Sequence, residues 1–196
     1  MLLVSCFEPF GGETINASLR ICQRLEQEKI AGAQFCVLPV VWKRSVAILL
    51  AEIERNMPRV VLSLGQARRG SISLERQAWN WDDFSIPDNE GQQIRQQKII
   101  ADAEDRLIST LPLERLHRRL LEENILSSFS ETAGTFVCNH LFYSLQHAVK
   151  DKNICSGFVH VPLLPEQTDD STVSMPFALQ LRAVRVMISE LIMLYS

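Results

Sequence analysis

RVVLSLG, residues 59–65, is the clearest buried strand in the sequence, because it is apolar after its first residue except for Ser63 and is closed by Gly65. A short continuous apolar run of this kind is typical of a strand in a parallel sheet that is covered on both faces. Three similar runs are predicted strands as well: 2–7, 33–40 and 154–161. Longer amphipathic segments separate these runs, and the alternation predicts an α/β fold with helices packed on a largely parallel sheet.

The amphipathic segments are the predicted helices. They cover residues 17–30, 45–56, 113–124, 139–150 and 173–195. Residues 66–112 are expected to be mostly irregular or extended. In the last helix, Arg182, Arg185 and Glu190 give a polar face, so this segment is predicted to be amphipathic and not transmembrane. With neither a repeat nor a linker, residues 1–196 are expected to form a single domain.

Composition narrows the class of partner. Twenty basic and twenty-three acidic residues give a net charge of −3, and no basic run occurs. Nucleic acid and an anionic membrane are therefore not expected as partners, and a small or peptidic ligand fits better. The N-terminal MLLVSCFEPFGG lacks the positive region and the apolar length of a signal peptide. The five cysteines form no C-x-x-C pair, which argues against disulfides and a zinc ribbon and predicts reduced thiols in the cytoplasm.

One of these cysteines, Cys138, lies where a loop is predicted to become a helix. Apolar residues recur at helical spacing after it, and the preceding TAGT (132–135) is made of small residues. Unpaired amides at a helix start stabilise a thiolate and can lower a cysteine pKa, so Cys138 is a candidate nucleophile. The alternative is simple burial, because free cysteine is among the most buried residue types.

A nucleophilic cysteine needs a base, and four histidines are available. His117 lies among charged residues on a predicted helix, and His147 belongs to the polar face of the 139–150 helix. His140 is two residues from Cys138 on that helix, which points it away from the thiol. His160 ends an apolar strand just before Pro162, and ligand crevices open at strand ends in α/β sheets. His160 is thus the best candidate base, with a structural histidine as the alternative.

A carboxylate that orients the base is expected on a segment near the ligand edge of the sheet. SLERQAWNWDDFSIPDNEG (73–91) is acidic and contains internal breakers. Its candidates are Glu75, Asp82, Asp83, Asp88 and Glu90. The residues alone do not choose among them.

Five blocks of the sequence, taken together, resemble the motif set of the pyroglutamyl peptidase I family, the pyrrolidone carboxyl peptidases. They are FEPFGG (7–12), LGQ (64–66), LERQAWNWDDFSIPDNEG (74–91), TAGTFVCNH (132–140) and GFVHVPLLPEQ (157–167). Several long blocks in the family's order are far more specific than one short motif. The resemblance implies a cytoplasmic cysteine peptidase that removes N-terminal pyroglutamate from peptides. It also implies an α/β/α sandwich, no metal or cofactor, and a homo-oligomer, either dimer or tetramer.

The resemblance also assigns roles to residues. It implies that Cys138 in FVCN is the nucleophile, that His160 in FVHVP is the base, and that Glu75 in LER orients the imidazole. The oxyanion is expected against the main-chain amide of Cys138. The implied substrate pocket is apolar with a few polar groups for the lactam, because a pyroglutamyl residue has no terminal ammonium. The pocket residues that the resemblance implies are Phe7, Phe10, Ile86, Phe136 and Val137, with Gln66 and Asn16 near the polar edge of the lactam.

This chain departs from the family pattern at several positions. It has GQARRG (65–70) where the family commonly reads GQAGGR, with one residue fewer before Glu75. Ser85 replaces a common Arg, Val40 a usual Thr, and Trp79 and Trp81 add bulk. Two alternatives therefore stand beside the peptidase. One is a weak or inactive member that binds N-terminally blocked peptides or scaffolds an oligomer, and the other is a cysteine amidase for another small lactam or amide.

Overall fold

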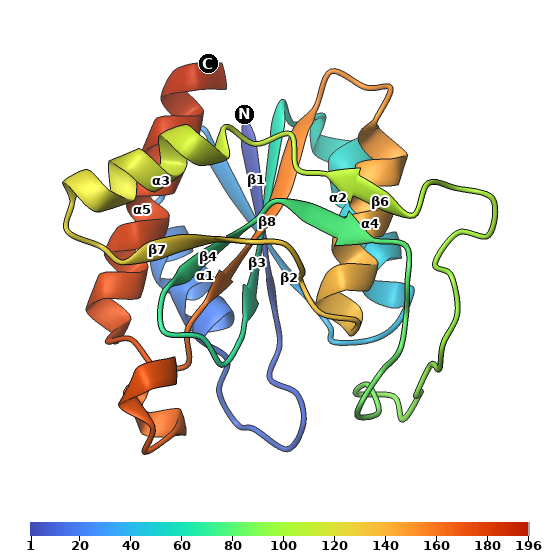
Figure 1. Cartoon of the computed structure of the whole chain (residues 1–196). Coiled ribbons are helices and arrows are strands. Elements are labelled where there is room, and N and C mark those ends of the chain that lie inside the picture. Colours follow the sequence, from blue (N-terminus) through green and yellow to red (C-terminus); the bar gives the residue numbers. More distant parts are fainter. Residues whose placement is uncertain (196) are drawn as a thin grey trace.

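A six-stranded mixed sheet forms the centre of the computed structural model, which describes residues 1–195 (Figure 1). Its strands are β1 (Leu2–Phe7), β2 (Ala33–Leu38), β3 (Val60–Gln66), β4 (Ile72–Glu75), β7 (Ser127–Ser130) and β8 (Cys155–Val161). They are arranged in the order β2-β1-β3-β8-β4-β7. The first four of these are mutually parallel, whereas β4 pairs antiparallel with β8 and parallel with β7. The predicted largely parallel sheet is confirmed.

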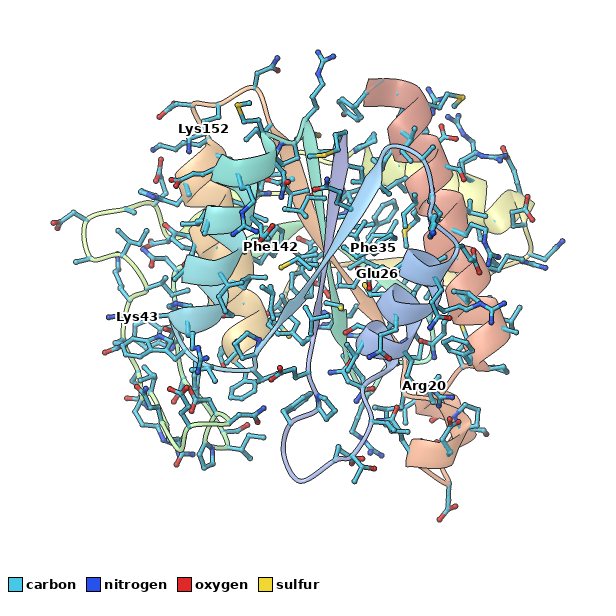
Figure 2. All side chains as sticks on the ribbon, turned by 180° about the vertical axis from the view of Figure 1, so that it is seen from behind. Arg20, Glu26, Phe35, Lys43, Phe142 and Lys152 are labelled. Atoms are coloured by element: carbon cyan, nitrogen blue, oxygen red, sulfur yellow. The ribbon has the colours of Figure 1, made fainter. Side chains whose placement is uncertain are left out.

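Helices cover both faces of this sheet, which makes the fold an α/β/α sandwich (Figure 1). On one face lie α1 (Ala17–Gln27), α3 (Leu113–Glu122) and α5 (Phe177–Tyr195), and on the other lie α2 (Arg44–Asn56) and α4 (Val137–Val149). A separate antiparallel pair, β5 (Gln77–Trp79) and β6 (Arg106–Ile108), packs beside α4. Two 3-10 turns, η1 (Pro165–Gln167) and η2 (Ser171–Val173), precede α5. Figure 2 shows from behind how side chains fill the space between sheet and helices.

The two faces of the sheet differ in chemistry. Side chains alternate between faces along a strand, so alternate positions meet different helices. Apart from Gln66 at the end of β3, the buried strand residues that pack toward α1, α3 and α5 are apolar: Leu2, Val4, Cys6, Val60, Leu62, Leu64, Ile72, Leu74, Val159 and Val161. The positions between them, toward α2 and α4, carry the other buried polar residues of this sheet: Ser5, Ser63, Ser73, Glu75, Ser156 and His160. Apart from Gln66, the polar strand residues thus belong to the face that α4 covers.

Several predicted boundaries are corrected. The helix predicted at 17–30 ends at Gln27, and the last helix begins at Phe177 because residues 171–173 form a 3-10 turn instead. Strands β4 and β7 were not predicted. Each has only four residues, with polar side chains at alternate positions in β4 and three serines in β7, so neither resembles the long apolar runs of the parallel strands.

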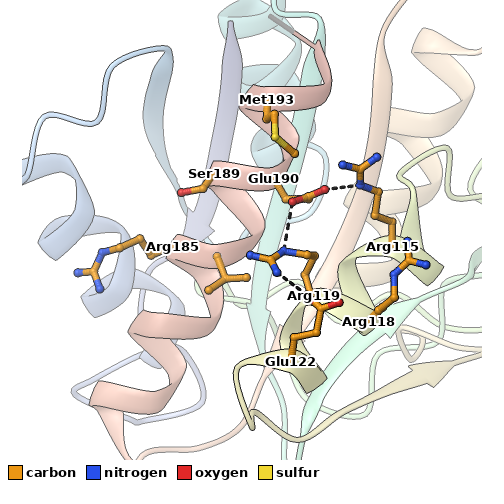
Figure 3. A pocket seen from close by; sticks show the side chains of 9 residues that line it. Arg115, Arg118, Arg119, Glu122, Arg185, Ser189, Glu190 and Met193 are labelled. Atoms are coloured by element: carbon orange, nitrogen blue, oxygen red, sulfur yellow. Dashed lines mark hydrogen bonds and ion pairs between the residues drawn. The ribbon is translucent and has the colours of Figure 1, made fainter.

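Helix α5 also differs from expectation at Glu190. This carboxylate, predicted on the polar face, is 4% exposed and pairs with Arg115 and Arg119 of α3, with 3.3 Å from Arg119 Nε to Glu190 Oε2 (Figure 3). The ion pairs join α3 to α5 beside a groove of about 810 Å³ that Arg118 and Met193 also line. Within the described chain, no helix has the length and apolar character needed to cross a membrane.

Close packing at Gly157 in β8 generates a testable prediction. A Cβ at this position would lie 2.8 Å from Leu111 Cδ1 and would also collide with Ser109 Oγ. Because such overpacking forces neighbouring groups to move, Gly157→Ala is expected to lower the free energy of unfolding by about 1–3 kcal/mol. Urea denaturation followed by circular dichroism measures this change.

The matched control is Gly157→Ala in a Ser109→Ala background. Removal of the hydroxyl relieves one of the two collisions, so part of the lost stability is expected to return. An unchanged denaturation midpoint in Gly157→Ala would contradict the packing at this strand.

Candidate functional site

Cys138 lies in the first turn of α4, as predicted. The helix begins at Val137 after Phe136, which has an extended backbone, and Gly134 turns the chain with a φ of +85° that glycine adopts without strain. In the described chain, the amides of Val137 and Asn139 donate to no residue, and the amide of Cys138 interacts only with its own thiol. Unpaired amides at a helix start give it partial positive charge, so a developing anion could be held there.

The thiol of Cys138 lies against β3. A Cβ placed on Gly65 would be 3.1 Å from Cys138 Sγ and 2.8 Å from the ring of Phe158. Gly65 is the register partner of His160 in the pairing of β3 with β8, and Phe158 and His160 are two residues apart on one face of β8. The absence of a side chain at Gly65 therefore gives Cys138 access to the sheet face that carries His160.

His160 is held by Glu75. His160 Nδ1 lies 2.7 Å from Glu75 Oε1, and both side chains are almost fully buried. Glu75 is opposite Phe158 in the antiparallel pairing of β4 with β8, which sets it diagonally across from His160 on the same face. With Nδ1 bound to the carboxylate, the Nε2 atom of the ring is left for another partner. The structure thus brings together the three residues that the sequence singled out.

The expectation of a lowered thiol pKa is wrong. Burial raises the pKa of Cys138 to about 12, and the negative charge of Glu75 raises it further. The guanidinium of Arg69 and the backbone N–H of Cys138 lower it, but they do not offset the other two. The helix start therefore does not by itself produce a resting thiolate, and the thiol must lose its proton to a base when it reacts.

The other acidic candidates have partners elsewhere. Asp82 Oδ2 lies 2.8 Å from His140 Nδ1, and Asp88 Oδ2 accepts from the backbone N–H of Trp42 at 2.8 Å. The remaining two form exposed ion pairs, Asp83 with Arg95 and Glu90 with Arg44. Of the five carboxylates that the sequence left open, Glu75 is the one in contact with His160.

Two of the remaining histidines have structural partners. His140 is 3% exposed and faces Asp82 and the indole of Trp42, so it does point away from the triad face. His117 is half-buried, with Nδ1 2.8 Å from Ser127 Oγ, and packs against Phe129.

Three of the predicted pocket residues form an apolar group beside the start of α4. The ring centroids of Phe10 and Phe136 are 5.8 Å apart, and Phe84 meets Phe136 edge-on at 4.8 Å. Ile86 is 39% exposed and lies within contact distance of Gly11 in the loop that carries Phe10. Phe10, Phe136 and Ile86 all keep surface that a ligand could contact.

The other four predicted pocket residues are buried. Phe7 and Val137 belong to the core under α2 and α4. Asn16 caps α1, because its Oδ1 accepts from the backbone N–H of Ser18 at 2.9 Å. Gln66 Oε1 accepts from the backbone N–H of Ala17 at 2.7 Å, and its Nε2 has no hydrogen-bond partner among residues 1–195. Gln66 thus retains two unused donors at the end of β3.

Sequence reasoning missed two residues that organise the site. Asn139 binds the backbone of Trp79 and Trp81 through both ends of its amide, at 2.8 to 2.9 Å, and so fixes the 79–81 segment beside Cys138. Arg69 contacts Glu75. Asn139 could have been found from its place in CNH, directly after the nucleophile, whereas Arg69 resembles any charged loop residue.

Metal-ligating side chains do not gather in the described part of the chain, since no group of three or more His, Cys, Asp or Glu could hold an ion there. The arginine-lined groove between α3 and α5 lies across the sheet from Cys138.

Comparison with known proteins identifies the family of the chain. The family model Peptidase_C15, described as pyroglutamyl peptidase, matches residues 1–193. The chain is 45% identical to the pyrrolidone-carboxylate peptidase of Vibrio campbellii over 169 residues, which cover 85% of this chain and 80% of that protein. It is 42% identical to the Bacillus cereus protein of the same name over 171 residues, covering 85% of this chain and 80% of that protein.

Solved structures show the same fold. Pyroglutamyl peptidase I from Bacillus amyloliquefaciens superposes with a TM-score of 0.88 at 35% identity, over 94% of this chain and 93% of that one. A mutant pyrrolidone carboxyl peptidase from Pyrococcus furiosus superposes with a TM-score of 0.88 at 38% identity, over 96% of both chains. The chain belongs to the pyroglutamyl peptidase family and is a cysteine exopeptidase of that type.

Proposed function

We propose that this chain removes an N-terminal pyroglutamyl residue from peptides with Cys138 as nucleophile, His160 as general base and acid, and Glu75 as the carboxylate that orients His160. The observation that carries the proposal is the 2.7 Å contact between His160 Nδ1 and Glu75 Oε1 on the sheet face reached by Cys138. A base whose second nitrogen is fixed by a carboxylate is the arrangement that nucleophilic catalysis requires.

The reaction follows from these positions. His160 Nε2 accepts the proton of the Cys138 thiol while the sulfur attacks the carbonyl that follows the lactam ring. The oxyanion that forms lies against the Cys138 amide at the start of α4, which donates to no other residue of the described chain. The imidazolium then gives its proton to the leaving amine as the C–N bond breaks. Water, deprotonated by His160, hydrolyses the thioester, which releases pyroglutamate and regenerates the thiol.

The pocket for the pyroglutamyl ring is assigned to the residues beside α4. Phe10, Phe136 and Ile86 offer apolar surface to the ring, and Phe7 and Val137 lie behind them in the core. The free Nε2 of Gln66 is placed to donate to the lactam carbonyl, while its Oε1 is held by the helix that Asn16 caps. A pocket without a carboxylate for an ammonium group favours a blocked N-terminus over a free one.

The proposal also covers the domain organisation, the cellular location, the assembly and the partners of the protein. We assign the activity to one peptidase domain, residues 1–196, that works in the cytoplasm as a homo-oligomer on free peptides, without nucleic acid, membrane, metal or cofactor. The net charge of −3 argues against nucleic acid and anionic membranes as partners. The oligomer and the cytoplasmic location rest on the resemblance to the family.

Light scattering of the purified chain is expected to give the mass of a dimer or a tetramer. A monomer at micromolar concentration would contradict the proposed oligomer.

The first activity prediction concerns the nucleophile. Wild-type protein is expected to release a fluorophore from a pyroglutamyl amide but not from an alanyl amide. Cys138→Ala is expected to lower kcat by about a thousandfold or more, since loss of a nucleophile removes the covalent route. A continuous fluorescence assay measures both rates.

Cys155→Ala is the matched control, because Cys155 is also partly exposed but lies at the start of β8, away from α4. It is expected to keep wild-type kcat. Absence of cleavage by folded, reduced wild type, or full activity in Cys138→Ala, would overturn the proposed function.

A second prediction concerns pH. Because burial raises the pKa of the Cys138 thiol to about 12, the thiolate fraction falls about tenfold for each pH unit below that value. Alkylation of Cys138 by iodoacetamide is therefore expected to rise steadily from pH 7 to pH 10, without the plateau that an ordinary thiol approaches above about pH 9. Mass spectrometry of the peptide that contains Cys138 follows the rate.

The same protein unfolded in denaturant is the control, and its Cys138 is expected to behave as an ordinary thiol. A rate that is already constant between about pH 6 and pH 8 would show a resting thiolate and would contradict the base-assisted first step.

A further inference from the structure

We propose that Arg69, in the loop between β3 and β4, is a positioning residue for the peptidase reaction, because its guanidinium fixes the Glu75 carboxylate against His160 and joins it to the loop that leads to Cys138. The proposal rests on the function proposed above. It concerns a residue of the loop that departs from the family pattern.

The contacts of Arg69 are specific. Arg69 Nη1 donates to Glu75 Oε1 at 2.8 Å, and this is the oxygen that His160 Nδ1 contacts at 2.7 Å. Arg69 Nη2 donates to the backbone carbonyl of Thr132 at 2.8 Å, in the loop before α4. One guanidinium therefore connects the segments that carry the carboxylate and the nucleophile.

Burial makes this contact important for Glu75. The Glu75 side chain has no exposed surface, and its Oε2 has no hydrogen-bond partner in the described chain. A buried carboxylate is costly unless charged groups or donors surround it. Arg69 and His160 are the two partners that Glu75 has, so loss of Arg69 leaves the carboxylate to a single imidazole.

The backbone of the loop directs Arg69 and not its neighbour toward the site. The backbone N–H of Arg69 donates to the carbonyl of Ala67 at 2.9 Å, and Gly70 packs directly against the carbonyl of Thr172 in η2. Arg68 is exposed, and its charge acts on Asp170 and not on Glu75. The two arginines differ in contacts although they are adjacent in sequence.

The charge of Arg69 has a second effect. Glu75 raises the pKa of the Cys138 thiol, whereas Arg69 lowers it. The charged and titratable groups that face one another here are Arg69 from the β3–β4 loop, Glu75 from β4, His160 from β8 and Cys138 from α4. Without Arg69, the carboxylate acts alone on the thiol, which disfavours the thiolate of Cys138. This effect reduces the reactive form of the enzyme at lower pH.

The test compares Arg69→Met and Arg69→Lys with Arg68→Met as the matched control. Arg69→Met is expected to lower kcat for a pyroglutamyl amide by about 10–100-fold with little change in KM, since misplacement of a catalytic group costs about that much. The acid limb of its kcat/KM profile is expected to shift to higher pH. Arg69→Lys is expected to recover part of kcat, and Arg68→Met to stay within about twofold of wild type.

Chemical rescue by guanidinium and alkylation of Cys138 distinguish a positioning role of Arg69 from a role in folding. Because Arg69 is 27% exposed, guanidinium ions at low millimolar concentration are expected to restore part of the kcat of Arg69→Ala. Alkylation of Cys138 in Arg69→Met is expected to require higher pH than in wild type. This readout needs no substrate, so it tests Arg69 even if wild type cleaves no pyroglutamyl amide.

Two results would overturn the proposal. One is wild-type kcat and an unshifted acid limb in Arg69→Met. The other is a loss of kcat that neither guanidinium nor Arg69→Lys restores, with unchanged pH dependence of Cys138 alkylation, which would reduce Arg69 to a structural role.

Discussion

The carboxylate of Glu75 has no exposed surface, and one of its oxygens accepts from both an imidazole and a guanidinium. Removing a charge from water is unfavourable by several kcal/mol unless the protein replaces the lost hydration with well-placed partners. The antiparallel pairing of β4 with β8 sets Glu75 diagonal to His160, which supplies one of these partners. The loop between β3 and β4 supplies the other partner, Arg69. The buried carboxylate of the site therefore depends on the mixed topology of the sheet.

Much of the fold could be predicted from the sequence, because long apolar runs predict buried strands and amphipathic segments predict helices. The strands β1, β2, β3 and β8 were each found within two residues. The strands β4 and β7 were missed, because their stability comes from their neighbours, β8 beside β4 and β4 beside β7, and not from their own composition. A short strand rich in polar residues is explained only when its neighbours are known.

The site was predictable to a similar extent. His160 follows from its position at the end of an apolar strand, and Cys138 from its position at a helix start. The residues alone could not choose Glu75 among five carboxylates, because that choice depends on which strand pairs with β8. The pKa of the Cys138 thiol was predicted in the wrong direction. The helix start was visible in the sequence, but the burial of the sulfur and the nearby Glu75 carboxylate, which together outweigh it, depend on the tertiary structure.

The difference between the two faces of the sheet has a consequence for how the sequence of such a protein can evolve. Apart from Gln66 at the end of β3, the buried strand residues toward α1, α3 and α5 are apolar, whereas the face toward α4 carries Cys138, His160 and Glu75. Substitutions among aliphatic residues on the first face alter packing without approaching the reacting atoms. Selection for tolerance of heat or cold can therefore act on one layer of the sandwich while the chemistry in the other layer is inherited unchanged.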